Sequence, residues 1–398
     1  MKRILGIILA LSLFVSGCGW MDGSYHSVTP HRQHTSDTQG TVVVAASYLE
    51  LRRALEDMVS DGVENRVISV GSFQDNQLAN SMEIAARYVK ATYPIGAYAV
   101  DEIQYELGTS GGVAAVAVTV SYRHSKAEIQ KIRQTADMEE ARTQIRNALT
   151  NYDTGLVMMV RNYESQDLQQ IIEDYAALNP ASVMETPEIT FQTYPNAGTK
   201  RVLEVRFTYQ SSRDTLRSMQ EQVQRVFASA SLYVSRDAKE SQKFSQLYAF
   251  LMERFPEYQV KTSITPAYSL LNHGVGDSKA FSNVYAQMCR EAGLECRSVV
   301  GTRNGEPWFW NIAQVDGYYY HIDLLTCQAS GAFRTLTDQD MDTYVWDYSA
   351  YPECTGAPAA PSVDDPAQTE ETDGSEPSET EVPSLPGEDA STPENTEE

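Results

Sequence analysis

The sequence is short of histidine, cysteine and positive charge. Of its 398 residues, six are His and five are Cys, and 31 Lys and Arg face 54 Asp and Glu, which gives a net charge of −23. Nucleic-acid binding needs clustered basic charge, so a nucleic-acid partner is disfavoured. The sequence also lacks a Gly-rich phosphate loop and the Cys/His spacing of a metal site, so we expect neither a cofactor nor a metal.

Long apolar runs are absent after the first 18 residues, so no later segment is expected to span a membrane. Residues 1–18 have the charged start and apolar middle of an export signal, and Val15-Ser16-Gly17-Cys18 resembles a bacterial lipobox. We therefore predict a lipoprotein signal peptide over residues 1–18, with Cys18 lipidated. The chain would be anchored to the outer face of the bacterial cell membrane, or to the envelope of a two-membraned cell. A plain secretory signal or an uncleaved anchor is the alternative.

Two polar segments flank the part of the sequence with regular patterning. Residues 19–40 carry Gly, Ser, Thr and Pro without periodicity, which predicts a flexible tether. Residues 355–398 contain seven Pro, thirteen Asp or Glu and no Lys or Arg, which predicts a disordered acidic tail. We expect this tail to be a solubilising extension.

Strand and helix patterns alternate from residue 41, which indicates an α+β fold. We predict one α+β repeat over residues 41–150 and a second over residues 151–232, each of βαββα type. Internal duplication is suggested because residues 118–125 line up with residues 205–212. Chance similarity of helix and hairpin signals is the alternative. Neither repeat carries a catalytic motif, and such modules in exported chains more often bind, space or pack than catalyse.

The last patterned part of the sequence, residues 233–354, carries side chains suited to chemistry. A Gly-Asp-Ser-Lys-Ala-Phe segment opens an amphipathic helix and places Ser278 at its N-terminus, where a thiolate or an oxyanion is favoured. Further on, Asp316-Gly317 separates two β-rich runs and predicts a two-residue hairpin. This turn pairs residue 315 with residue 318 and makes Trp308 and Asp323 diagonal neighbours on one face of the sheet.

This arrangement resembles the transglutaminase-like superfamily, whose papain-like fold has Cys at a helix start, His in one strand and Asp in the next. The resemblance rests on residues 276–281, on Trp308-Phe309-Trp310-Asn311 and on Tyr320-His321-Ile322-Asp323. It implies a transglutaminase-like domain over residues 233–354. Ser278 and Trp308 stand where the family has its Cys and His, and only Asp323 matches.

The two substitutions predict a degenerate catalytic triad. A serine needs a base to take its proton, and the indole nitrogen of Trp308 is only a donor. His273 and His321 are the histidines that could replace the missing base. The hairpin register puts His321 on the face of Asp323 but on the side away from residue 308, and His273 precedes the helix by five residues. We therefore expect no catalysis at Ser278.

Instead, we predict that the domain binds a peptide, a glycopeptide or a protein at the cell envelope. The ligand groove would be lined by Ser278, Trp308, Trp310 and Asp323. One alternative is an active Ser-dependent hydrolase or acyl transferase that acts on cell-wall peptides or surface proteins. A second alternative is a purely structural envelope module.

Four cysteines lie in this last domain: Cys289, Cys296, Cys327 and Cys354. In an exported protein they could form two disulfides in any of three pairings. Among the possible disulfides, we predict the one between Cys327 and Cys354 first. Free thiols are expected if the envelope is not oxidising.

Overall fold

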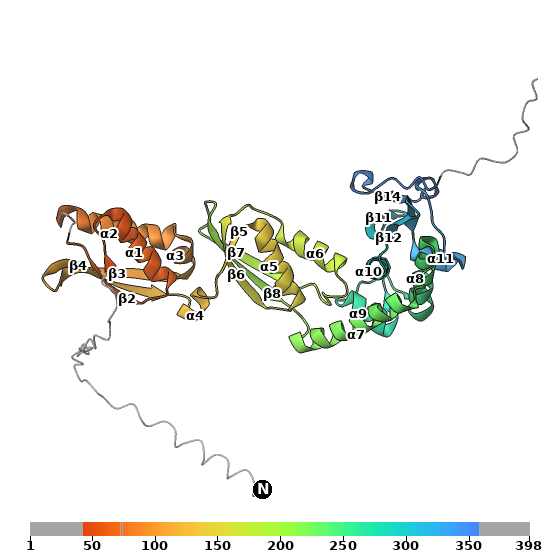
Figure 1. Ribbon diagram of the computed structural model, residues 1–398, viewed down its shortest axis with the longest axis horizontal. Helices are drawn as coiled ribbons and strands as arrows, with labels where there is room; N and C mark the ends of the chain where they lie inside the picture. The colour runs from red at the N-terminus through yellow and green to blue at the C-terminus, as the bar shows by residue number, and fades with distance from the viewer. Residues whose placement is uncertain (1–42, 72, 74, 358–398) are drawn as a thin grey trace, which may run out of the picture. The chain divides into compact units, whose positions relative to one another are not determined.

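The computed structural model describes residues 43–357 apart from residues 72 and 74 (Figure 1). The predicted signal peptide with Cys18, the tether at 19–40 and nearly all of the predicted tail lie outside the described residues. Within the described part, none of the helices combines the length and the apolar character that crossing a membrane requires. The described chain is α+β and divides into two compact units, which we treat separately.

The first unit comprises Met1–Gln134, Val157–Arg161 and Thr193–Leu203. Its four-stranded sheet has the order β1-β2-β4-β3, with a parallel β1–β2 pair and antiparallel neighbours otherwise. Buried and exposed residues alternate along the centre of β4, so one face of the sheet packs into the core against α1, α2 and α3. The bounds are β1 Val43–Val44, α1 Tyr48–Ser60, β2 Asn65–Ser69, α2 Asp75–Ala91, α3 Pro94–Ala99, β3 Val100–Ser110, β4 Val113–Tyr122 and α4 Lys126–Ile129.

A second four-stranded sheet has the order β5-β6-β8-β7. Its elements follow the chain order β-α-β-α-β-β, and the first sheet shows the same order once the short helix α3 is set aside. The bounds are β5 Arg133–Asp137, α5 Met138–Thr150, β6 Gly155–Asn162, α6 Leu168–Leu178, β7 Glu188–Tyr194 and β8 Arg201–Thr208.

The predicted βαββα units with a boundary at residue 150 do not match this topology. Strand β5 separates the helices α4 and α5 before residue 150 and joins the second sheet. A new helix starts after β5 because the Asp137 side chain accepts the backbone N–H groups of Glu139 and Glu140. The elements of the second sheet therefore begin at Arg133, before the predicted boundary.

The second unit comprises Thr135–Leu156, Asn162–Gln192 and Glu204–Glu398. Its C-terminal part combines helices with a four-stranded sheet of order β13-β12-β11-β14. The bounds are α7 Arg213–Tyr233, α8 Glu240–Arg254, β9 Glu257–Tyr258, α9 Pro266–His273, β10 Val275–Gly276, α10 Ser278–Glu291, β11 Cys296–Arg303, β12 Glu306–Val315, β13 Tyr318–Ile322, α11 Leu324–Ser330 and β14 Tyr344–Trp346, with short 3-10 turns at Asp338–Asp340 and Tyr348–Ala350.

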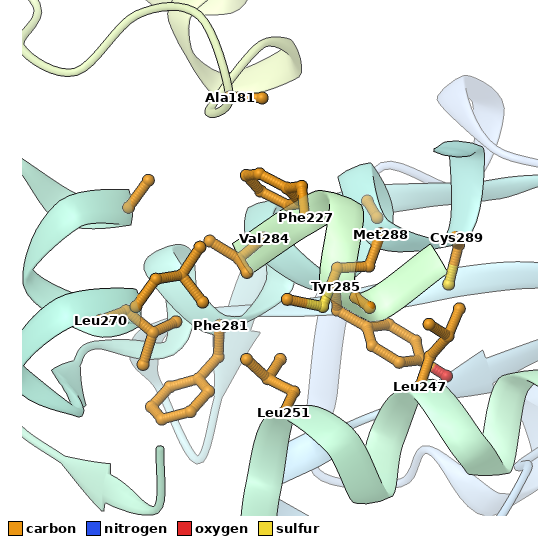
Figure 2. Close-up of a cluster of buried hydrophobic side chains, with 14 of the residues drawn as sticks. Ala181, Phe227, Leu247, Leu251, Leu270, Phe281, Val284, Tyr285, Met288 and Cys289 are labelled. Carbon is orange, nitrogen blue, oxygen red and sulfur yellow. The ribbon is translucent and has the colours of Figure 1, made fainter. Parts of the chain in front are cut away.

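Helix α10 is the centre of this part of the unit. Figure 2 shows its side chains Phe281 and Tyr285 among apolar side chains of the neighbouring helices, including Leu251 of α8 and Leu270 of α9. The Tyr285 hydroxyl also donates a hydrogen bond to the Phe244 carbonyl oxygen at 2.8 Å. This packing fixes the position of the α10 N-terminus, where Ser278 lies.

The predicted hairpin register is confirmed. Strands β12 and β13 are antiparallel with Val315 opposite Tyr318, and Asp316 and Gly317 have φ angles of 50° and 89°. Positive φ at both turn residues is what a type I′ turn requires. Strand β13 ends at Ile322, because Asp323 caps the helix α11 that follows.

A second core lies between this sheet and the C-terminal segment. It buries Trp310 together with Val299, Tyr344 and Trp346. Gly301 permits the Trp310 ring and the backbone of strand β14 to lie close to strand β11. A Cβ atom at this position would overlap the Val345 carbonyl oxygen and lie 2.7 Å from Trp310 Cη2.

We predict that Gly301→Ala lowers the free energy of unfolding by about 1–3 kcal/mol, because both the indole and strand β14 would have to move. The measurement is urea denaturation of the chain from residue 19 onward, followed by tryptophan fluorescence. The control is Val300→Ala on the same strand, where the side chain is 59% exposed and the loss should stay below about 1 kcal/mol. Equal effects of the two variants would contradict the packing described here.

Candidate functional site

Ser278 is the first residue of α10, as the sequence predicts. Asp277 is the N-cap, and its carboxylate accepts the Ala280 N–H at 2.8 Å. Ser278 is 7% exposed, and its Oγ accepts a hydrogen bond from the backbone N–H of Phe309 at 3.3 Å. The hydroxyl thus links the helix start to β12, and no described residue offers it a base.

Trp308 and Asp323 are brought together, as the hairpin register predicts. The Trp308 indole Nε1–H donates to Asp323 Oδ2 at 2.9 Å. The indole ring lies 5.6 Å from the Tyr258 ring and 5.2 Å from the Arg303 guanidinium carbon. The indole N–H of Trp308 can only donate a hydrogen bond to the carboxylate. A catalytic histidine at this position would need a second nitrogen with a free lone pair to accept a proton.

Asp323 is 1% exposed, and both of its oxygens are occupied. Oδ1 accepts the backbone N–H groups of Leu325 and Thr326, each at 3.1 Å. Oδ2 accepts the Thr326 hydroxyl at 2.8 Å and the Tyr344 hydroxyl at 2.6 Å, in addition to the indole. Burial and the neighbouring Asp323 carboxylate raise the pKa of Tyr344, so its hydroxyl remains a donor.

The two candidate histidines make their contacts elsewhere. His273 is exposed at the end of α9, and its ring contacts Tyr268 and Asn272 of the same helix. His321 is fully buried, with Nδ1 at 2.9 Å from Trp310 Nε1 and Nε2 at 2.8 Å from Asp338 Oδ1. The contacts found for both histidines thus lie away from Ser278.

His321, Asp338 and Cys354 place three potential metal-ligand atoms within 4.8 Å of one another. An indole N–H only donates, so Nδ1 of His321 accepts and its proton lies on Nε2, directed at Asp338. A protonated Nε2 has no lone pair for a metal. The Asp338 Oδ2 atom accepts the Cys354 N–H at 2.9 Å, which makes the group a hydrogen-bonded link to the C-terminal segment.

The predicted open groove is not found. The space bounded by Ser278, Phe309 and Asp323 is too small to hold a water molecule. Trp310, which was expected to line the groove, is 1% exposed, and its indole packs at 5.7 Å from Trp346 in the second core. An indole buried on all sides cannot contact a ligand, so this part of the prediction is wrong.

The predicted disulfide between Cys327 and Cys354 is also wrong, because both residues are free thiols. The Cys327 sulfur contacts the carbonyl oxygen of Arg334, whereas the Cys354 sulfur contacts that of Pro352. Cys289 and Cys296 are free and buried as well. Burial, followed by contact with Cys296, raises the pKa of the Cys289 thiol well above its usual value.

Comparison with known proteins agrees with this geometry. The family model of the transglutaminase-like superfamily matches residues 228–355. These residues form a transglutaminase-like domain. The matched residues overlap the predicted range of 233–354. No curated protein matches the sequence.

Three solved structures resemble this chain at low sequence identity. One is a TGase, with 11% identity, coverage of 52% of this chain and 60% of that chain, and a TM-score of 0.24. Another is a candidate cysteine protease from Cytophaga hutchinsonii, with 14% identity, 40% and 70% coverage, and a TM-score of 0.23. A candidate protease from Parabacteroides distasonis has 10% identity, 68% and 44% coverage, and a TM-score of 0.20. The chain spans less than two thirds of the length of that TGase.

Sequence reasoning missed three residues that complete the surroundings of Asp323. Tyr344 and Thr326 donate to it, and Arg303 Nη1 lies 3.8 Å from its Oδ2. Thr326, three residues after an Asp that caps a helix, could have been found from the capping pattern. Arg303 and Tyr344 come from β11 and β14, and nothing in their local sequence indicates that they meet Asp323.

The stability of the protein is predicted to depend on the protonation of His321. Burial lowers the pKa of His321 below 6.5, although the bond to Asp338 acts in the opposite direction. The unfolded chain therefore takes up the proton first, at about pH 6.5. The free energy of unfolding should therefore fall as the pH drops below that value. The protonation of His321 contributes at most about 1.4 kcal/mol to this fall for each pH unit.

The test is the urea midpoint between pH 5.5 and 8 for the native chain and for His321→Asn. An asparagine amide accepts from Trp310 and donates towards Asp338 without titrating, so this part of the slope should disappear in the variant. An unchanged slope in His321→Asn would rule out His321 as its source.

Proposed function

We propose that this protein is an exported lipoprotein, lipidated on Cys18, whose transglutaminase-like domain binds a peptide, a glycopeptide or a protein instead of catalysing acyl transfer. The observation that carries the proposal is the 2.9 Å bond from Trp308 Nε1–H to Asp323 Oδ2. This bond occupies the carboxylate that would orient a histidine.

The chemistry of Ser278 supports the same proposal. A general base typically contributes a factor of about 10²–10⁴ to the rate, and a serine hydroxyl is a weak nucleophile without one. The partner of Ser278 Oγ is the backbone N–H of Phe309, which cannot accept a proton. Neither His273 nor His321 makes a contact that would replace the base.

We also infer that the two α+β sheets arose by internal duplication and serve as non-catalytic modules. The shared strand order and the shared succession of elements support this inference, in addition to the sequence similarity. Duplicated modules without catalytic side chains are suited to spacing or binding at the cell envelope.

We predict that the native chain neither incorporates a fluorescent amine into protein acceptors nor hydrolyses cell-wall peptides, and that Ser278→Ala changes nothing. The positive control is the double variant Ser278→Cys, Trp308→His. An imidazole at position 308 can donate to Asp323 through one nitrogen and act as a base through the other, so activity should appear. Native activity that is lost in Ser278→Ala would instead establish a serine-dependent hydrolase or acyl transferase.

The lipid anchor is tested by Cys18→Ala in a bacterial expression host. We expect the native chain in the membrane fraction, released by detergent but not by high salt, because an acylated cysteine inserts its chains into the bilayer. The Cys18→Ala variant should lose the lipid, which mass spectrometry of the mature N-terminus would detect. An unlipidated native chain would disprove the lipoprotein assignment.

A further inference from the structure

Strand β3 forms one edge of the sheet in the first unit. It is the last strand in the order β1-β2-β4-β3 and has 11 residues, whereas strands average about 5–6. Residues 106–110 at its end are all exposed. The edges of the transglutaminase-like sheet are better protected, because β14 has only 3 residues and β13 is bridged to Leu336 through His321. Strand β3 is therefore a long edge that the described residues leave open.

The hydrogen bonds of the neighbouring strand β4 show which backbone groups of β3 point outward. The N–H of Val120 on β4 donates to the Glu64 carbonyl oxygen beside β2, so the even-numbered residues of β4 bond to β2. The odd-numbered residues of β4 therefore bond to β3, where they lie opposite even-numbered residues. The N–H and C=O groups of Ile103, Tyr105 and Leu107 consequently point away from the sheet. Within the described part of the chain, no hydrogen bond to these groups is found.

The features that usually protect an open edge are missing along most of β3. Edge strands are commonly short, or they carry Lys, Pro or a β-bulge that prevents pairing with another strand. Residues 91–122, which include the whole β3–β4 hairpin, contain no Lys or Arg, and β3 contains no Pro. The irregularity in its register lies between Val100 and Glu102, at the start of the strand. The rest of the edge can therefore pair with a further strand.

The charge of β3 favours a basic partner. Asp101, Glu102 and Glu106 are the charged residues of the hairpin, and all three are exposed. No ion pair is found for any of them among the described residues. A second copy of β3 would bring three further acids to the same edge, and like charges on neighbouring strands are destabilising. A strand with Lys or Arg would instead gain from each facing pair.

The two glutamates lie on one face of the strand. Ile103 and Tyr105 pack against the core of the first unit, so alternation places Glu102, Gln104 and Glu106 on the opposite face. The Gln104 amide donates to Glu102 Oε2 at 3.0 Å. These residues alternate with the ones whose backbone groups point outward. Opposite an added strand they would occupy the non-hydrogen-bonded positions, where facing side chains come closest.

We propose that strand β3 binds an extended basic segment of another protein, which joins the sheet as an additional strand. The backbone of that segment pairs with the outward groups of residues 103, 105 and 107. Two Lys or Arg side chains, four residues apart, pair with Glu102 and Glu106. Apolar residues alternate with them and cover Leu107, whose side chain is 46% exposed. This surface is separate from the transglutaminase-like domain, so the proposal goes beyond the function proposed above and does not rest on it.

The test is fluorescence polarisation with the chain from residue 19 onward, which retains every described residue. The probe is a labelled peptide, Thr-Val-Lys-Val-Thr-Val-Lys-Val-Thr, and the control peptide has Glu in place of both Lys. We expect the native chain to bind the Lys peptide about tenfold more tightly than the Glu peptide. The double variant Glu102→Gln, Glu106→Gln should bind the Lys peptide about fivefold more weakly. The control Glu221→Gln, at an exposed position of α7, should change the affinity by less than about twofold.

Leu107→Pro separates strand pairing from charge attraction. Proline removes an outward N–H but no hydrogen bond to β4, so the chain should stay folded by circular dichroism and lose binding of the Lys peptide. The matched control Leu107→Ala keeps the N–H and should change the affinity by less than about threefold. The charge variants test the proposal even if Leu107→Pro does not fold.

Three results would overturn the proposal: no binding of the Lys peptide, equal binding of the two peptides, or binding that a folded Leu107→Pro variant retains. A native dimer in sedimentation that Leu107→Pro dissociates would identify a second copy as the occupant and overturn the basic partner. None of these results bears on the amine-incorporation assay, which tests the transglutaminase-like domain separately.

Discussion

The buried carboxylate of Asp323 is the interaction on which the site depends. Removing a charge from water is costly unless hydrogen bonds replace the lost solvation. Here the donors come from three places: from α11, which Asp323 caps, from Trp308 on β12, and from Tyr344 on β14. One side chain thereby connects the hairpin, the following helix and the edge strand of the sheet.

This constraint explains why tryptophan is an acceptable residue at position 308. Asp323 needs a donor there, and an indole N–H supplies one as well as an imidazole N–H does. The indole lacks a second nitrogen that would accept a proton, so Trp308 supplies the hydrogen bond to Asp323 but offers no base. Ser278 is a similar case, because its hydroxyl still accepts from the Phe309 N–H at the start of β12. Both side chains make the hydrogen bonds that the fold requires at these positions.

The parts of the site that the sequence predicted are those set by local geometry. The Asp316-Gly317 turn fixed the register, and the register brought Trp308 to Asp323. The burial of Trp310 was missed because its partners, Tyr344 and Trp346, lie more than thirty residues further along the chain. Strand β5 was missed for a related reason: five residues with one buried position carry almost no strand signal, and the pairing partner is distant. Long-range packing determines both the burial of Trp310 and the formation of strand β5.

Two different surroundings meet at the start of α10. Its first residue faces β12 through Ser278 Oγ, whereas Lys279 and Asn283 line a cavity whose far wall is α6. The Ser278 contact and the cavity are separate features of one helix, and none of the three triad positions lines the cavity. Helix α6 of the second sheet thereby shares one cavity lining with residues of the transglutaminase-like domain.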